Sequence, residues 1–370
     1  MEKYKIKNLG TIISGGTPST SNENYWDGNI IWITPKDLSK NKCKYIYTGE
    51  RNISKDGLEH SSAKLLPKNA VLLSSRAPIG YLALAGCELT TNQGFKSIVC
   101  NESIILSEYL YYLLSTKIDD LISISSGSTF LELSKSAFEN LELNIHNINE
   151  QQHIVDIIGS IDDLIESNNK LVLKLLSILN NKLEYLITKS TEFIPLKSII
   201  SERKERIGLN DVKLLSVVNT GELVLQDEYF DKNTASADMK KYKLIRKFDY
   251  AYNPARINIG SIGMLKENYL GAISPIYVVF EIDENYKYYL DFYKSSKYMR
   301  KYIEKKSSGS VRQNLPFDEF ASIEIPNINT EFLKEFNSLC DLYYKKINDL
   351  KTKTIKLQAI KDQYLKKFFG

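Results

Sequence analysis

The sequence has few cysteines and histidines and no long apolar run, and each absence excludes a class of protein. Its four cysteines lie far apart, with no CxxC pair and no histidine at ligand spacing, so they predict reduced thiols in a cytoplasmic protein. No run reaches the roughly 18 apolar residues of a membrane-spanning helix, and the start of the chain lacks the apolar core of a signal peptide. We therefore expect no disulfide framework, no zinc site and no membrane association.

Motifs of common catalytic sites are missing as well. The sequence contains no GxxxxGK[ST] loop, no GxGxxG after a strand pattern and no HExxH, and its three histidines (His60, His146 and His153) are scattered. Asn253-Pro254-Ala255 shares two residues with the Asn-Pro-Pro-aromatic motif of amino-methyltransferases, but it lacks the second proline and the aromatic residue. We expect no catalytic residue, no metal ligand and no cofactor in this chain, so the sequence favours a binding protein over an enzyme.

The charge balance excludes little. A net charge of +4, from 49 basic and 45 acidic residues, permits nucleic-acid binding and equally describes a mildly basic cytoplasmic protein. The hydrophobic fraction of 43% and the charged fraction of 25% are those of an ordinary globular protein. A chain of 370 residues is long enough for two domains, each with its own core.

The feature that organises the chain is a long apolar repeat in Glu150–Lys189, which has no proline and one glycine. This spacing predicts a coiled-coil helix about 60 Å long at 1.5 Å per residue. Asn168 and Lys182 interrupt the repeat, as polar residues that set a pairing register often do. The apolar residues recur at seven-residue spacing in two rows, namely Ile154, Ile161 and Leu175, and Ile158, Ile165, Val172, Leu179 and Leu186.

A second helix of this kind is predicted at the end of the chain, in Thr330–Phe369. One long helix cannot bury such a stripe alone, so we expect the two helices to pair. Parallel pairing is the alternative to antiparallel pairing, but the short connection from Lys189 to Pro195 favours an antiparallel coiled coil with a globule at each end. The seam residues of this helix are Phe336, Tyr343, Leu350, Leu357 and Tyr364.

The segment between the two helices repeats the layout of the segment before the first helix, with a different sequence. Arg256-Ile257-Asn258-Ile259-Gly260 stands 180 positions after Arg76-Ala77-Pro78-Ile79-Gly80. Ser307-Ser308-Gly309-Ser310 likewise repeats Ser125-Ser126-Gly127-Ser128. Ordered matches of this kind indicate a tandem duplication of a globule followed by a long helix.

The fold class that follows is α+β, with two mixed α/β domains in pseudo-two-fold tandem, separated by two long helices. The predicted ranges are 1–149 for the first globule, 150–190 for the central helix, 191–329 for the second globule and 330–370 for the C-terminal helix. Apolar periodicity predicts helices at Ser107–Ser123 and Tyr288–Glu304. Short apolar runs predict strands at Ile30–Ile33, Ala70–Ser74, Ser97–Cys100, Leu141–Ile145 and Leu214–Asn219.

Polar side chains gather in the loops between these strands. Arg, Lys, Asn, Gln, Ser and Thr hydrogen-bond base edges and phosphates, so the loops are candidates for DNA contact. Small polar residues also make ordinary turns, and a structural salt bridge explains the repeated arginines Arg76 and Arg256 about as well. The candidate DNA-binding residues are Thr17, Ser19, Lys36, Ser75, Arg76, Asn92, Gln93, Ser128, Arg203, Lys204, Asn219, Arg256, Asn258, Ser310, Arg312 and Gln313.

Over its whole length the chain resembles the specificity subunits of type I restriction–modification systems. The resemblance lies in Gly16-Thr17-Pro18-Ser19, in Tyr25-Trp26-Asp27-Gly28, in Ile31 to Leu38, in Asn92-Gln93-Gly94-Phe95 and in Glu150-Gln151-Gln152 at the helix start. Such subunits carry two target recognition domains and two paired helices. The chain departs from the family before each helix: Ile145 to Asn149 stands where the family often has a proline-rich turn, and Thr330-Glu331 stands in place of Glu-Gln at the second helix.

The resemblance implies a non-catalytic subunit that reads a bipartite double-stranded DNA target, one block for each domain. Two methyltransferase subunits would dock on the helices and methylate adenine with S-adenosylmethionine, and restriction (translocase–nuclease) subunits would join them. Two alternatives stay open at this point. One is a coiled-coil scaffold whose two globular heads bind proteins or other ligands, and the other is a fused methyltransferase with an unrecognised site.

Overall fold

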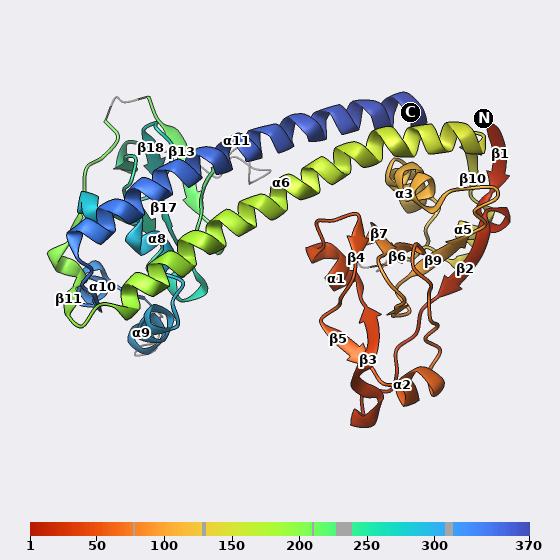
Figure 1. Ribbon diagram of the computed structural model, residues 1–370, viewed down its shortest axis with the longest axis horizontal. Coiled ribbons are helices and arrows are strands. Elements are labelled where there is room, and N and C mark those ends of the chain that lie inside the picture. The colour runs from red at the N-terminus through yellow and green to blue at the C-terminus, as the bar shows by residue number, and fades with distance from the viewer. Residues whose placement is uncertain (77, 128–130, 209–210, 227–238, 308–313) are drawn as a thin grey trace. The chain divides into compact units, whose positions relative to one another are not determined.

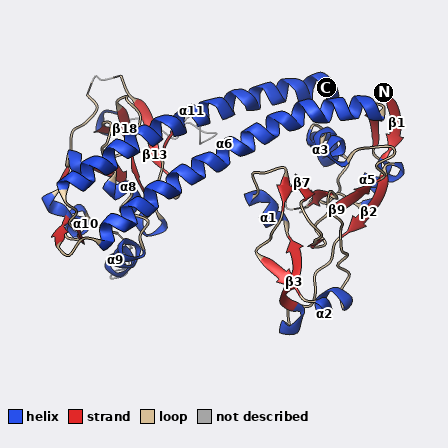
Figure 2. Ribbon diagram, in the orientation of Figure 1, coloured by secondary structure: helices blue, strands red, loops and turns tan. Residues whose placement is uncertain are grey.

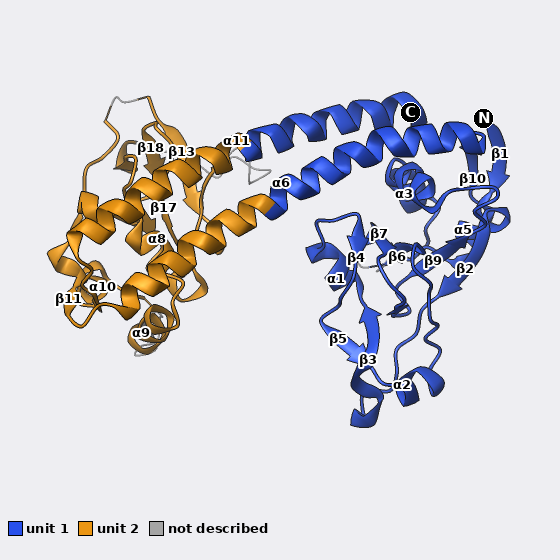
Figure 3. Cartoon of the chain, in the orientation of Figure 1, with its two compact units in different colours: residues 1–170, 350–370 blue, residues 171–349 orange. Residues whose placement is uncertain are grey.

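The computed structural model describes the chain except for residues 77, 128–130, 209–210, 227–238 and 308–313. The chain forms two compact units, unit 1 (residues 1–170 and 350–370) and unit 2 (residues 171–349), shown in Figure 3. Both long helices contribute to both units: α6 spans Ile148–Thr188 and α11 spans Thr330–Phe369. Their ends lie within two residues of the predicted ranges. The predicted globule ranges 1–149 and 191–329 stay a prediction.

Unit 1 combines short strands with short helices beside its portions of the long helices (Figures 1 and 2). Its five-stranded sheet has the order β2-β9-β6-β7-β4, and a three-stranded sheet has the order β5-β3-β8, while β1 pairs with β10. The strands are β1 (Glu2–Lys5), β2 (Gly10–Ser14), β3 (Trp26–Ile33), β4 (Tyr45–Ile46), β5 (Arg51–Ile53), β6 (Val71–Ser75), β7 (Ile79–Ala85), β8 (Thr90–Thr91), β9 (Lys96–Cys100) and β10 (Glu142–Ile145). The short helices are α1 (Pro35–Lys40), α2 (Lys55–Glu59), α3 (Ser107–Ser115), α4 (Ile118–Ser123) and α5 (Lys135–Asn140).

Unit 2 has the same plan in its described residues. One four-stranded sheet has the order β12-β19-β16-β17, a second has the order β14-β13-β18-β15, and β11 pairs with β20. The strands are β11 (Phe193–Pro195), β12 (Ile200–Glu202), β13 (Lys213–Val217), β14 (Leu223–Leu225), β15 (Lys243–Ile245), β16 (Tyr250–Tyr252), β17 (Ile262–Met264), β18 (Gly271–Ile273), β19 (Val278–Ile282) and β20 (Glu324–Pro326). The short helices are α8 (Tyr289–Tyr293), α9 (Lys297–Ser307) and α10 (Phe317–Ala321).

The strand orders support the duplication that the sequence predicts. The run β2-β9-β6-β7 in unit 1 matches β12-β19-β16-β17 in unit 2, strand for strand. In each unit the second sheet contains a parallel pair, β3 with β8 and β13 with β18. The first strand of each unit pairs antiparallel with the last, β1 with β10 and β11 with β20. The two halves therefore share most of their topology although their sequences differ; β4 joins the first sheet of unit 1, whereas β15 joins the second sheet of unit 2.

In unit 1 the beginning of α6 packs against the end of α11. Ile154 and Ile158 of α6 and Phe369 of α11 are buried in one core with the sheet and α3. Removing each such side chain from water stabilises the fold by roughly 1.5–3 kcal/mol. Asn168 Nδ2 donates to Thr354 Oγ1 over 3.3 Å, so this polar residue of the seam pairs with a polar partner.

In unit 2 the end of α6 packs against the beginning of α11. Leu179 and Leu186 of α6 share a buried core with Phe336 and Cys340 of α11, together with the aromatic side chains of β16 and α8. Residue numbers therefore rise along one helix as they fall along the other. The predicted antiparallel pairing is confirmed, and the predicted seam residues are buried or half-buried.

Both helices predicted inside the globules are interrupted. The one over 107–123 divides into α3 and α4, because Ser115 and Thr116 direct their hydroxyls to the carbonyls of Tyr112 and Leu113. The one over 288–304 divides into α8 and α9, where Ser296 Oγ accepts from Met299 N and starts a new helix. Serine and threonine compete with the helical backbone for hydrogen bonds, which an apolar-periodicity argument does not register.

The strand predicted at Leu214–Asn219 is β13, which ends at Val217, since residues after it form a turn. Among the described residues, no helix is long and apolar enough to cross a membrane. The described part of the chain also holds no group of three or more His, Cys, Asp or Glu side chains placed to bind a metal.

Candidate nucleic-acid interface

In unit 1, four of the loops singled out in the sequence meet at one place. Gly16 N donates to Thr91 O over 2.9 Å, and Asn92 N donates to Ile33 O over 3.0 Å. Ser75 N donates to Gly94 O over 2.7 Å. These bonds hold the loop after β2, the start of α1, the end of β6 and the β8–β9 loop together.

Gly94 lies at the centre of this group. A Cβ atom there would lie 3.3 Å from Pro35 Cγ and 3.6 Å from Arg76 Cγ, so the two side chains close over the glycine. Thr17 Oγ1 donates to Gln93 Oε1 in the same region. The structure therefore brings together the loops that carry Thr17, Lys36, Arg76, Asn92 and Gln93.

Two tryptophans hold the Gly-Thr-Pro-Ser loop in place. Trp32 Nε1 donates to Gly16 O over 2.9 Å, and Trp26 Nε1 donates to Ser19 O over 3.1 Å. The two rings meet edge to face, with centroids 5.1 Å apart, and the Arg51 guanidinium lies 3.5 Å from the Trp26 ring centroid. Both indoles are buried, so each N–H needs an acceptor, and the loop carbonyls provide it.

The start of α1 is fixed by a capping box. Thr34 N donates to Asp37 Oδ2 over 2.8 Å, and Asp37 N donates back to Thr34 Oγ1 over 3.4 Å. Glu50 N donates to the other Asp37 oxygen over 2.9 Å. Lys36 stands exposed on this first turn, and its ammonium lies 2.8 Å from the Glu50 carboxylate.

Arg76 shares an acidic partner with a lysine that the sequence analysis missed. Glu132 lies 3.7 Å from the Arg76 guanidinium and 3.8 Å from Lys96 Nζ. Lys96 is buried, its Nζ lies 3.4 Å from Ser75 Oγ, and its burial lowers its pKa, which Glu132 partly offsets. The sequence signal that could have identified Lys96 is its position beside the apolar run of β9, because a lysine is rarely buried without a partner.

The remaining candidates of unit 1 fall in different places. Ser19 is exposed, and its hydroxyl lies 2.8 Å from that of Ser21. Ser75 is fully buried beneath Lys96, so its hydroxyl faces the protein interior. Ser128 lies outside the described residues.

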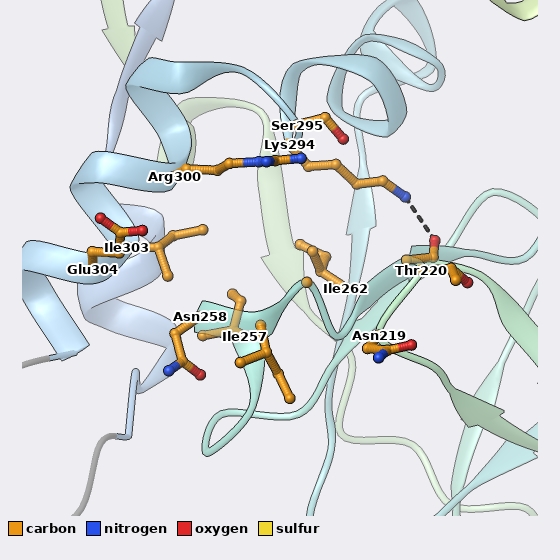
Figure 4. Close-up of a pocket in the computed structure, with 13 residues that line it drawn as sticks. Asn219, Thr220, Ile257, Asn258, Ile262, Lys294, Ser295, Arg300, Ile303 and Glu304 are labelled. Atoms are coloured by element: carbon orange, nitrogen blue, oxygen red, sulfur yellow. Dashed lines mark hydrogen bonds between the residues drawn. The ribbon is translucent and has the colours of Figure 1, made fainter. Parts of the chain in front are cut away.

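In unit 2, a cavity of about 280 Å³ lies between the β13–β14 turn, the 3-10 turn Ile257–Ile259 and the segment from the end of α8 into α9 (Figure 4). Asn219 and Asn258 line this cavity, so the structure brings two of the predicted residues together. The other lining residues are Thr220, Gly221, Ile257, Ile259, Gly260, Ile262, Lys294, Ser295, Arg300, Ile303 and Glu304.

The two turns at this cavity touch through Gly260. Its φ of 94° lies in the left-handed region, and a Cβ atom there would lie 2.6 Å from Asn219 O. A side chain at this position would strain the backbone and push the turns apart. Arg256 is exposed at the N-cap of Ile257–Ile259, shortly after strand β16. Arg76 occupies the corresponding place in unit 1, after the equivalent strand β6.

Arg203 and Lys204 have partners within the protein. The Arg203 guanidinium lies 2.8 Å from Asp249 and 2.7 Å from Glu281, so carboxylates already occupy its donors. Burial raises the pKa of Asp249, and hydrogen bonds from Arg246 N and Arg203 partly offset the increase. Lys204 is exposed and lies 3.0 Å from Glu202. Among the predicted residues of unit 2 that the structure describes, Arg203 is thus the least available to a ligand.

Ser310, Arg312 and Gln313 lie outside the described residues. Which side chains touch DNA stays a prediction for the whole set of sixteen. The geometry adds a physical distinction within it: Thr17, Gln93, Arg76, Asn219 and Arg256 lie in loops at the surface, while Ser75 and Arg203 are engaged inside their units.

A family model and individual known proteins that resemble this chain all point to the same family. Residues 1–177 match the family described as "Type I restriction modification DNA specificity domain". The chain is 32% identical over 408 aligned positions to the type I restriction enzyme MjaIX specificity subunit of Methanocaldococcus jannaschii, covering 99% of this chain and 92% of that protein. It is 28% identical over 174 positions to an Escherichia coli type I restriction enzyme specificity subunit, covering 45% of this chain and 42% of that one.

Among solved structures, the type I restriction–modification system S subunit of M. genitalium shares the fold. The comparison covers 100% of this chain and 96% of that one, with a TM-score of 0.61 and 17% sequence identity. At this identity the likeness speaks for the fold alone. The assignment to a family rests on the 32% sequence identity with the M. jannaschii protein, which extends over nearly the full length of both chains. The chain belongs to the family of type I restriction enzyme specificity subunits.

Proposed function

We propose that the chain is the DNA-recognition subunit of a type I restriction–modification complex, and that each unit reads one block of a bipartite target. The observation that carries the proposal is that the loops carrying Thr17, Arg76, Asn92 and Gln93 meet in unit 1. These side chains offer the donors and acceptors that read base edges in the major groove, where arginine pairs with guanine and amides pair with adenine.

Unit 2 supports the same role with a different set of side chains. Asn219 and Asn258 line its cavity and Arg256 stands exposed beside it. The equivalent strands carry different residues in the two units, so the two blocks of the target should differ in sequence.

In this proposal the residues of this chain recognise DNA and take no part in the methylation reaction. Methylation of adenine requires S-adenosylmethionine and a base turned out of the duplex, and both belong to partner methyltransferase subunits. Two such subunits would dock on α6 and α11, and restriction subunits would join the complex. Large apolar side chains exposed on these helices support a docking role: Leu164, Ile355 and Ile360 in unit 1, and Leu171, Leu173, Ile178, Tyr185, Phe332 and Leu342 in unit 2.

Selection from a random duplex pool tests the proposal directly. The full-length chain is immobilised, bound duplexes are sequenced through several rounds, and retention is measured at several salt concentrations. We expect two short defined blocks separated by an undefined spacer of fixed length, with affinity that falls steeply as salt rises. Enrichment of a single block would contradict the bipartite reading. Salt-independent retention without enrichment would instead favour a scaffold with protein-binding heads.

A further inference from the structure

A buried ionic cluster lies under the β13–β14 turn of unit 2. Its centre is Asp291 on α8, whose side chain is 5% exposed. Lys294 Nζ lies 2.7 Å from Asp291 Oδ1, and Lys266 Nζ lies 2.7 Å from Asp291 Oδ2. Tyr344 on α11 donates its hydroxyl to Oδ2 over 2.8 Å. Both carboxylate oxygens are therefore occupied.

Lys294 connects this cluster to the cavity. Its side chain is only 10% exposed. Its ammonium donates to Gly221 O over 2.8 Å (Figure 4) and also lies 2.7 Å from Asp291. A lysine ammonium can donate three hydrogen bonds, so one group serves both partners. Burying this cation is favourable only with Asp291 beside it, because an unpaired buried charge is costly.

The turn fits closely around Lys294. Gly221 has a φ of 78°, and a Cβ atom there would lie 3.1 Å from Ile262 O and 3.2 Å from Lys294 Nζ. The glycine therefore lies between the backbone of β17 and the ammonium group, where a side chain would strain the left-handed backbone and require its neighbours to shift by a few tenths of an ångström. Asn219 and Thr220, the two residues before it, are exposed at the tip of the turn.

The turn also has hydrogen bonds of its own. Gly221 N donates to Val218 O, and Val218 N donates to Glu222 O, each over 3.0 Å. The hairpin can thus form without Lys294, while the orientation of its tip depends on what holds the Gly221 carbonyl. Asp291 on α8 contacts the Lys294 ammonium, and Tyr344 on α11 donates to the same Asp291 carboxylate. Because both residues stand on regular helices, they keep the ammonium in one place.

We propose that Lys294 is the positioning residue of the base-reading turn of unit 2, fixing Asn219 and Thr220 through the Gly221 carbonyl. The inference rests on the proposed function, because it requires that this turn reads DNA. Asp291 and Tyr344 set the position of the ammonium and touch no ligand. Loss of the lysine loosens the turn, so the preference for particular bases falls more than the overall affinity for duplex DNA.

The test is duplex selection with the full-length chain and three variants. Lys294→Met keeps the aliphatic stem and removes the donors, Lys294→Arg restores a cation with donors, and Lys297→Met changes an exposed lysine nearby as a control. The block read by unit 1 is identified with Arg76→Ala and serves as an internal reference. We expect Lys294→Met to lower the preference for the best base about tenfold in the other block alone. Lys294→Arg should recover part of it, and Lys297→Met should match the wild type.

Hydrogen exchange provides a second measurement that a general loss of stability would not imitate. Amides of residues 220–222 should exchange faster in Lys294→Met, while those of β16 and β19 keep their protection. Tyr344→Phe removes one anchor without opening the core, and it should relax the same block by a smaller factor; this variant decides the matter if Lys294→Met does not fold.

The outcomes separate the two proposals. A wild-type chain that enriches no sequence overturns the proposed function and this inference with it. A wild-type chain with two blocks, together with a Lys294→Met protein that keeps both blocks sharp or blurs both equally, overturns only the positioning role.

Discussion

Lys361 of α11 and Asp162 of α6 form an ion pair in unit 1, with 2.6 Å between Nζ and Oδ1 and with side chains only 15% and 13% exposed. Tyr112 of α3 donates its hydroxyl to the other oxygen of Asp162 over 2.8 Å. One carboxylate thus joins the globule to both long helices. A partly buried pair resists screening by solvent far better than a surface pair does.

Loss of this pair should weaken unit 1. We expect Lys361→Met to lower the free energy of unfolding by about 2 kcal/mol, because the Asp162 carboxylate keeps its burial and loses a charged donor. Both tryptophans of the chain, Trp26 and Trp32, lie in unit 1, so urea denaturation followed by tryptophan fluorescence reports this unit. Lys356→Met, at an exposed position of the same helix, is the matched control. Equal midpoints for the two variants would show that the pair contributes nothing.

Arg76 should affect one block of the target. We expect Arg76→Ala to reduce discrimination at one or two base pairs by 1–3 kcal/mol, about 5- to 150-fold, with the second block unchanged. Duplex selection with the variant measures this, and Lys68→Ala, an exposed lysine of the same unit, serves as the control. Relaxation of both blocks to the same degree would contradict reading by separate units.

The indole of Trp32 should matter through its hydrogen bond. Trp32→Phe keeps most of the buried ring and removes the donor to Gly16 O, leaving that carbonyl without its partner. We expect a loss of roughly 1–3 kcal/mol of stability and weaker preference in the block read by unit 1. Thermal melting and duplex selection measure the two effects. Tyr47→Phe, at an exposed aromatic residue of the same unit, should change neither.

Asp291 gives a pH dependence to the stability of unit 2. Burial raises the pKa of Asp291, but the nearby Lys294 and Lys266 ammonium groups outweigh this effect and hold it well below its usual range. The folded-state pKa is depressed, so the stabilisation is full above the unfolded pKa near 4 and is lost as pH falls toward the folded value. We expect Asp291→Asn to be less stable than the wild type at neutral pH, by a margin that shrinks below about pH 4.

Circular dichroism melting of both proteins between about pH 7 and pH 2.5 measures that margin, and tryptophan fluorescence from unit 1 provides the reference within the same molecule. A margin that stays constant across this range would show that Asp291 does not carry a depressed pKa.

The length of α6 should set the spacer of the target. Inserting four residues after Lys170 and four before Leu350, where the two compact units divide, adds about 6 Å to each helix at 1.5 Å per residue. We expect the spacer to lengthen by one or two base pairs at about 3.4 Å each, with both blocks unchanged. Duplex selection reads the spacer directly, and an unchanged spacer would exclude the helix as a ruler.

The long helices could be predicted closely because their signal is local and strongly periodic. Seven-residue spacing of Ile154, Ile161 and Leu175 required no knowledge of the partner, and the ends of α6 fall within two residues of the prediction. The globule helices were harder to predict, since Ser115 and Thr116 end one helix and Ser296 starts another through local hydrogen bonds that apolar periodicity does not record.

Some residues of the candidate site could likewise be predicted from the sequence, and others could not. Loop composition indicated Thr17, Arg76 and Gln93, since these residue types in turns suit base and phosphate contact. Lys96 was missed because it lies in a strand, and its place beside Ser75 and Glu132 comes from pairing between β6 and β9. Arg203 was included because arginine suits DNA, and only the fold shows its carboxylate partners.

The sequence by itself determined the duplicated plan, the paired helices and the family, because repeats, heptads and motifs are properties of neighbouring residues. Tertiary structure decided which loops meet around Gly94 and Gly260, and which cations face inward. It also decided that Lys294, Asp291 and Tyr344 converge beneath the β13–β14 turn. Those contacts join residues that are distant along the chain, and strand pairing and core packing alone determine whether such residues meet.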